Sequence, residues 1–160
     1  MTTEWRGTIK QGIVAGLLGF GAVAVVFALV NLGAGRSPLY TAAALGGALF
    51  YGVADPAVVS ITPGAVLAYS ALHLGVFMAF GVLAAALATL ADRGWQLWFV
   101  ALFFFIFISF HLVAAVQGLA TPMRSVLSGT MVWGAGIAAS LLMAWYLLRA
   151  HPRMRAAQPW

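Results

Sequence analysis

The stretch TPGAVLAYSALHLGVFMAFGVLAAALATLADRG, residues 62–94, decides the fold. It begins with Thr62 and Pro63, a hydroxyl suited to cap a helix and a proline suited to its first turn, and it carries no Asp, Glu, Lys or Arg before Asp92. The apolar run between them exceeds the roughly 20 residues that cross the hydrocarbon core of a bilayer. It therefore predicts a transmembrane helix over about 63–90.

Three more apolar stretches predict spans of the same kind, over about 9–32, 95–119 and 122–148. The last one opens with Thr121-Pro122, which repeats the cap-and-proline signal. Only the short turn Asp92-Arg93-Gly94 separates the second span from the third, so these two are expected to be antiparallel neighbours. Gly12 and Gly16 in the first span form a GxxxG pair, which favours close contact with another helix.

A shorter apolar segment, residues 38–53, separates the first two spans. Ser37-Pro38 starts it in the same way as the longer helices, but it holds several glycines and is too short to cross a bilayer comfortably. We expect an interfacial or re-entrant helix there. The predicted fold class is thus an all-α integral membrane protein: a four-transmembrane-helix bundle with this short helix between helices 1 and 2, forming a single membrane domain over residues 1–160.

The composition agrees with this fold class. Hydrophobic residues make up 64% of the chain and charged residues only 7%, with a mean hydropathy of +1.03, whereas about a quarter of the residues in a soluble domain are charged. The net charge of +5 comes from eight Lys and Arg against three acidic residues, without a basic helix face, so the expected partner is the lipid bilayer and no nucleic acid. The absence of cysteine excludes thiolate catalysis and Cys-ligated zinc or iron–sulfur sites.

The distribution of basic residues predicts the orientation, because cytoplasmic loops retain Lys and Arg. With four spans and a cytoplasmic N-terminus, the basic residues on the cytoplasmic side are Arg6, Lys10, Arg93, Arg149, Arg153 and Arg155. Only Arg36 and Arg124 then lie outside. Counting residues 38–53 as a fifth span would reverse this bias. We therefore expect both termini, including a basic tail at 149–160, on the cytoplasmic side, with a bacterial cytoplasmic membrane as the expected location.

Two histidines are the candidate functional residues, because ionisable side chains are costly inside a bilayer and often mark a site there. His73 and His111 each lie a few residues from the midpoint of a predicted helix. Since those helices are antiparallel, the two imidazoles are expected within about one helical turn of the same depth. His151, in the basic tail, is expected to be a solvated residue at the interface.

Two kinds of ligand fit that pair. Haem b takes two axial histidines, and Arg36 and Arg124 would lie on the outer side to meet its propionates, although packed helices only about 8–10 Å apart leave little room for it. A copper or zinc ion fits the close spacing better, with Met131 as a third ligand at similar depth. Alternatively, each histidine is neutral and hydrogen-bonds a neighbour such as Ser70, one turn before His73, which fixes the helix register. The cofactor therefore stays open.

No catalytic motif accompanies these residues. The sequence lacks GxSxG, HExxH, Walker and dinucleotide-binding patterns, and no Asp or Glu lies within a predicted span, so we do not expect an enzyme. The leading hypothesis is a non-catalytic membrane subunit that packs with other subunits into a larger membrane complex, with electron transfer as one setting. The alternatives are a haem b- or metal-binding membrane protein that uses His73 and His111, and a small homo-oligomeric channel or transporter.

Overall fold

The computed structural model describes residues 3–92, 102, 106, 123 and 126–152. It gives bounds for four α-helices: α1 (Thr3–Gly33), α2 (Tyr40–Tyr51), α3 (Pro63–Ala91) and α5 (Gly129–Ala150). A short 3-10 helix, η1 (Pro56–Val58), lies between α2 and α3. The part of the chain described in this way contains no strand. The predicted span at 95–119 lies outside it, apart from Leu102 and Ile106.

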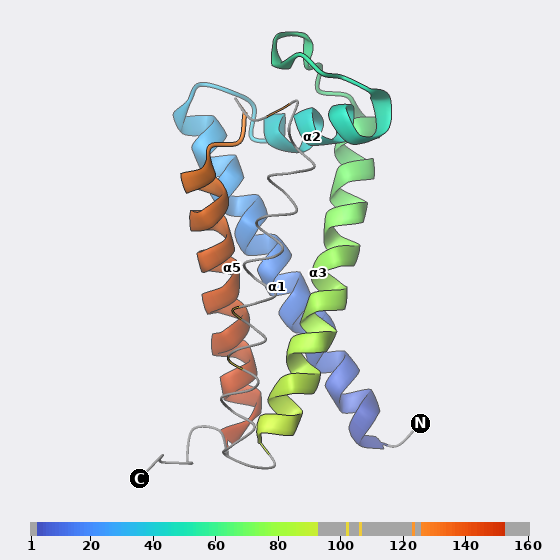
Figure 1. Ribbon diagram of the computed structural model, residues 1–160, viewed down its shortest axis with the longest axis vertical. Helices are drawn as coiled ribbons and strands as arrows, with labels where there is room; N and C mark the ends of the chain where they lie inside the picture. Colours follow the sequence, from blue (N-terminus) through green and yellow to red (C-terminus); the bar gives the residue numbers. More distant parts are fainter. Residues whose placement is uncertain (1–2, 93–101, 103–105, 107–122, 124–125, 153–160) are drawn as a thin grey trace.

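Three of these helices, α1, α3 and α5, are long and apolar enough to cross a membrane. They run along the length of the molecule, and α2 lies across one end of them (Figure 1). The chain enters α1 and leaves α5 at the opposite end, which we call the terminal end, in contrast to the α2 end. With 12 residues, α2 is about 18 Å long, too short for a span. The expectation of a helical protein with several apolar spans is confirmed at this level.

Hydroxyl caps set where two of the long helices begin. Thr62 accepts a hydrogen bond from the first turn of α3, which starts where the sequence places it. By contrast, α5 starts at Gly129 with Ser128 as its cap, and not at the expected position 122. The difference arises because Val126 and Leu127 form a buried turn against α2 instead of continuing a helix.

Two apolar clusters join the helices. The first lies between α1, α3 and α5 and consists of Ala15, Val23, Phe77, Ala85, Ala88, Ala135, Ala139, Met143 and Leu147. The second lies next to α2 and consists of Ala44, Leu45, Met123, Val126, Leu127 and Val132. Alanine predominates in the first cluster. Small side chains of this kind let helix backbones approach closely, which is how helices associate in lipid.

The glycine pair of α1 faces α3. A side-chain carbon on Gly12 would overlap the backbone of Val82, and one on Gly16 would lie 2.5 Å from the carbonyl oxygen of Phe77. Both glycines therefore sit directly against the backbone of α3. The close helix contact predicted from the GxxxG spacing is confirmed, with α3 as the partner helix.

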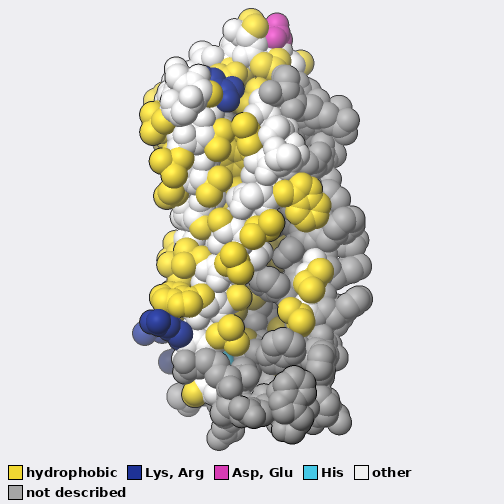
Figure 2. Space-filling model, turned by 90° about the vertical axis from the view of Figure 1, so that its left-hand side faces the viewer, with side chains coloured by type: hydrophobic (Ala, Val, Ile, Leu, Met, Phe, Trp, Pro, Cys, Tyr) yellow, Lys and Arg dark blue, Asp and Glu magenta, His cyan; other side chains and the backbone are white. Residues whose placement is uncertain are grey.

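The outer surface of the long helices is apolar. Figure 2 shows hydrophobic side chains spread along one face, with basic side chains near the two ends. Leu67 on α3 and Leu141 on α5 leave 67% and 66% of their surface exposed. Lipid covers such a surface naturally, whereas in water it would drive association. The three long helices are thus those of an integral membrane protein.

Candidate functional site

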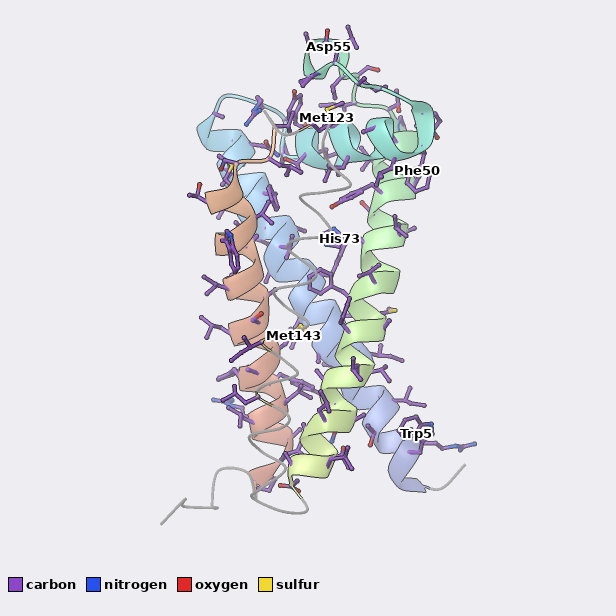
Figure 3. All side chains as sticks on the ribbon, in the orientation of Figure 1. Trp5, Phe50, Asp55, His73, Met123 and Met143 are labelled. Carbon is purple, nitrogen blue, oxygen red and sulfur yellow. The ribbon has the colours of Figure 1, made fainter. Side chains whose placement is uncertain are left out.

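His73 lies in the third turn of α3, within a stack of aromatic rings. Tyr69, His73 and Phe77 recur every four residues and so share one face of the helix. The His73 ring centroid lies 5.1 Å from that of Tyr69 and 5.0 Å from that of Phe77. Phe20 of α1 adds an edge-on ring at 5.8 Å. Figure 3 shows the imidazole projecting from α3 into the bundle. The site is therefore an imidazole enclosed by three aromatic side chains.

This imidazole makes no hydrogen bond to any residue in the described part of the chain, so the proposed bond to Ser70 is not formed there. The face that carries His73 also bridges the two apolar clusters: Phe77 belongs to the first, and Tyr69 packs against the second. Within the described part of the chain, the neighbours of the imidazole are aromatic rings, and its nitrogens have no partner there.

The remaining candidate ligands are His111, Arg124 and Met131. His111 and Arg124 lie outside the described residues, so the pairing with His73 is untested. Met131 lies in the first turn of α5, about 3 Å along the helix from its start, whereas His73 lies about 15 Å along α3. Both helices begin at the α2 end (Figure 1). The late start of α5 therefore shifts Met131 toward that end relative to the imidazole.

Arg36 lies at the α2 end, in the turn between α1 and α2. Its guanidinium carbon stands 4.7 Å from the ring centroid of Tyr40, a cation–π contact. Its Nε is buried and has no hydrogen-bond partner among the residues that the structure describes. A buried arginine nitrogen without a partner is unusual, because buried polar groups are almost always hydrogen-bonded.

Asn31 is a buried polar residue that the sequence reasoning overlooked. Its side chain is 1% exposed, and its Nδ2 donates to Thr41 Oγ1 at 2.9 Å and to the Pro38 carbonyl oxygen at 3.4 Å. The sequence does single this residue out, because Asn31 is the one asparagine of the chain and stands at the end of an apolar run. An amide in such a place needs a partner, because an unpaired one in hydrocarbon is costly.

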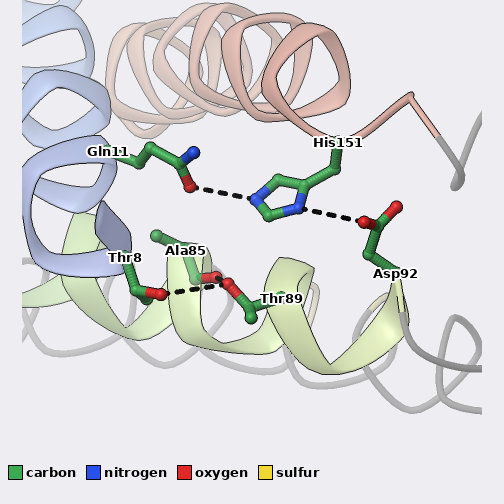
Figure 4. Close-up of polar contacts among 6 residues, drawn as sticks. All are labelled: Thr8, Gln11, Ala85, Thr89, Asp92 and His151. Atoms are coloured by element: carbon green, nitrogen blue, oxygen red, sulfur yellow. Dashed lines mark hydrogen bonds and ion pairs between the residues drawn. The ribbon is translucent and has the colours of Figure 1, made fainter. Parts of the chain in front are cut away.

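A second polar cluster joins the helices at the terminal end and corrects the expectation for His151. This residue is 7% exposed rather than solvated. Its Nε2 lies 3.1 Å from Gln11 Oε1 of α1, and its Nδ1 lies 3.8 Å from Asp92 Oδ2 at the end of α3 (Figure 4). Its place in a basic tail predicts exposure to solvent. In the structure, however, the beginning of α1 and the end of α3 meet the end of α5 here and enclose His151.

Two threonines extend this cluster. Thr8 and Thr89 lie with their hydroxyl oxygens 3.3 Å apart, and Thr89 also donates to the carbonyl oxygen of Ala85 at 2.8 Å (Figure 4). The bond within α3 satisfies the hydroxyl, and the contact with α1 ties the two helices together. Polar side chains at this end thus link helices to one another.

Three pairs of described polar side chains join different helices or helix ends: Asn31 with Thr41, Thr8 with Thr89, and Gln11 with His151. No three His, Asp or Glu side chains of the described residues gather as a metal site. The sequence matches no protein-family model, and searches of the curated proteins and of the solved structures find no similar protein.

Proposed function

We propose that the chain is a non-catalytic subunit of a larger membrane complex, crossing the membrane four times. The course of the chain supports the fourth crossing. α3 ends at the terminal end, whereas α5 begins at the α2 end, so residues 93–128 have to return from one end to the other. Those residues include the apolar stretch 95–119, which is long enough for a span.

The charge distribution supports cytoplasmic termini in a bacterial cytoplasmic membrane. Among the described residues, Arg6 and Lys10 lie in the first turns of α1, and Arg149 lies in the last turn of α5, all at the terminal end. Arg36 is the described basic residue at the α2 end. Positive residues gather on the cytoplasmic side of membrane proteins, so the terminal end is the cytoplasmic one.

A single observation carries the proposal of a structural role: the buried polar side chains join helices. Asn31 binds Thr41 between α1 and α2, and Thr8 meets Thr89 between α1 and α3. Polar contacts of this kind fix the relative positions of helices in lipid. The outer face of α5 meanwhile presents Ile137, 56% exposed, and other apolar side chains. A rigid bundle with an apolar exterior suits a subunit that packs among other membrane helices.

The test is purification from native membranes in mild detergent, followed by mass analysis of intact complexes. We expect the chain to co-elute with other membrane proteins in fixed stoichiometry. An unrelated tagged membrane protein expressed at the same level controls for chains that merely share the micelle. Recovery of the chain as a stable monomer, or as an oligomer of itself alone, would contradict the proposal.

A second function, binding of haem b or of a metal ion, is favoured by the surroundings of His73. Its imidazole lies among Phe20, Tyr69 and Phe77 with no hydrogen bond to the described residues, which suits an axial ligand beside a flat apolar macrocycle. In that arrangement His73 and His111 would hold the haem iron, and Arg36 and Arg124 would meet the propionates. For copper or zinc, His73 and His111 would be the ligands, since Met131 lies nearer the α2 end than the imidazole does.

Absorbance in the Soret region and metal analysis decide this second function. Cells supplied with haem, iron, copper and zinc provide wild-type protein, His73→Ala and the control His151→Ala, which changes a described histidine at the terminal end. We expect the cofactor to be lost only with His73→Ala, in a protein that still elutes as folded. A colourless, metal-free wild type ends the hypothesis.

A further inference from the structure

The turn that carries Arg36 is held rigidly on α1. The backbone N–H of Arg36 donates to the carbonyl oxygen of Asn31 at 2.8 Å, and that of Gly35 donates to Leu32 at 3.0 Å. This is the pair of bonds of a Schellman motif, and Gly35 has the left-handed φ of +68° that the motif needs. Asn31 also binds Thr41 of α2. Arg36 therefore projects from a fixed point and not from a loose loop.

Tyr40 provides a fixed platform beside the guanidinium. Its hydroxyl donates to the carbonyl oxygen of Pro56 at 3.2 Å, which holds the ring between α2 and η1. Arg36 lies over that ring, with its Cζ 4.7 Å from the centroid. The ring thus covers one face of the guanidinium, and no described carboxylate pairs with its N–H donors, which suit a planar or tetrahedral oxyanion.

The positive charge of Arg36 has no counterpart among the described residues. The acid nearest in sequence at the α2 end is Asp55, and its carboxylate accepts a hydrogen bond from Ala57 N–H at 2.8 Å, as the cap of η1. No ion pair joins Asp55 or any other described acid to Arg36. Together with the unpaired, buried Nε, this leaves a preorganised cation that lacks its anion.

We propose that Arg36, held over Tyr40, binds the phosphate of a membrane phospholipid at the α2 end of the bundle. The position along α1 supports a lipid as the source of the phosphate. Leu29 and Leu32, on the last turns of α1, are 63% and 56% exposed. Arg36 follows where the apolar run ends, which is the depth of the lipid headgroups. Acyl chains can therefore lie along these leucines while the phosphate meets the guanidinium.

Binding of defined lipids to the delipidated, full-length protein in detergent tests the site. The probes are phosphatidylglycerol, a galactosyl diacylglycerol with the same acyl chains but no phosphate, and inorganic phosphate. Intact-protein mass spectrometry counts bound lipids. We expect wild type to retain one phosphatidylglycerol more tightly than the galactolipid, and Arg36→Ala to weaken that binding about tenfold, the effect of one lost charge-assisted contact.

Two further variants separate the site from a general loss of structure. Arg36→Lys keeps the charge but not the planar donors, so it should bind phosphatidylglycerol with intermediate affinity. Arg149→Ala removes an arginine that lies over an aromatic ring, Trp145, at the terminal end, and it should leave the tight lipid in place. Equal retention of both lipids by wild type would overturn the proposal, because the acyl chains alone would then account for binding.

Three other results would also overturn it. Unchanged phosphatidylglycerol binding by folded Arg36→Ala would show that the arginine is not the site. Displacement of the lipid by millimolar inorganic phosphate would assign the site to a free anion instead of a headgroup. A Soret band that disappears with Arg36→Ala would assign the guanidinium to a haem propionate.

Discussion

The carbonyl oxygen of Gly12 in α1 occupies the place where a side-chain carbon on Gly81 of α3 would have to lie. The two backbones are therefore in direct contact, with no side chain between them. Association of helices in lipid rests on packing and not on exclusion of water, so such close approach is a main source of stability. An added side chain at either glycine can therefore be expected to be poorly tolerated.

Gly81→Ala should therefore destabilise the protein. An added methyl group forces α1 and α3 apart, and overpacking of this kind costs about 1–3 kcal/mol. Gly75→Ala on the same helix is the matched control, because a side chain there would meet nothing within 4 Å. Unfolding in mixed micelles of increasing SDS content should show a lower midpoint for Gly81→Ala alone. Equal midpoints for the two variants would refute the close contact.

The hydrogen bond between Asn31 and Thr41 should appear as a coupling energy. In a double-mutant cycle with Asn31→Ala and Thr41→Val, we expect a coupling of about 0.6 kcal/mol, the average for side-chain hydrogen bonds inside a membrane protein, and at most about 1.7 kcal/mol. Ser37→Ala replaces Thr41→Val in the control cycle, because among the described residues Ser37 Oγ accepts a hydrogen bond from the backbone N–H of Leu39 and makes none with Asn31. That control should be additive with Asn31→Ala, and a Thr41 cycle that is additive too would exclude the bond.

The polar cluster around His151 should hold the end of α5 in place. His151→Phe keeps a ring of similar size but removes both nitrogens, so the contacts with Gln11 and Asp92 are lost. We expect trypsin to cleave after Arg149 faster in this variant, because the last turn of α5 opens more often. Gln11→Ala should produce part of the same effect.

Arg6→Gln is the control for that experiment, since it changes a charge at the same end on an exposed side chain. It should leave the cleavage rate at Arg149 unchanged. If His151→Phe also leaves the rate unchanged, the cluster does not restrain α5.

The sequence predicts those features of the fold that depend on neighbouring residues. It does not predict the contacts of the site residues, because these come from distant parts of the chain. Thr62 and the following proline mark the start of α3 in sequence and structure, because a cap uses only neighbouring residues. The GxxxG pair predicted a close contact but not its partner, because the spacing describes one helix face only. The start of α5 was misplaced because Val126 and Leu127 pack against α2, more than seventy residues earlier in the chain.

The partners of the polar residues could not be predicted for the same reason, since they also lie far away in the sequence. His151 lies in a basic tail, and nothing in its neighbours indicates that the beginning of α1 and the end of α3 enclose it. Asn31 could have been singled out as a lone amide in an apolar run, but its partner Thr41 could not. His73 was identified because an imidazole in a predicted span is rare, whereas its aromatic neighbour Phe20 comes from another helix.

The orientation can be tested directly, because the chain contains no cysteine and single cysteines can be introduced without background. Val58→Cys places a thiol on η1, where the side chain is 66% exposed at the α2 end. Gly7→Cys places one at the terminal end, where a side chain meets nothing within 4 Å. A membrane-impermeant maleimide added to intact cells should label Val58→Cys, and Gly7→Cys only after permeabilisation. The reverse pattern would put the termini outside.

The fourth crossing has its own test at the start of α5. Thr130 is exposed in the first turn of this helix, which begins at the α2 end. If residues 93–128 cross the membrane, Thr130→Cys lies on the same side as Val58→Cys, and the impermeant maleimide should label both in intact cells. Gly21→Cys is the control inside the membrane. Gly21 lies in the middle of α1, where a side chain would meet no protein atom within 4 Å. Its thiol should stay unlabelled, because a thiol in hydrocarbon does not ionise. Labelling of Val58→Cys without Thr130→Cys would mean that residues 93–128 do not return to the outer side, and the four-span arrangement would then fail.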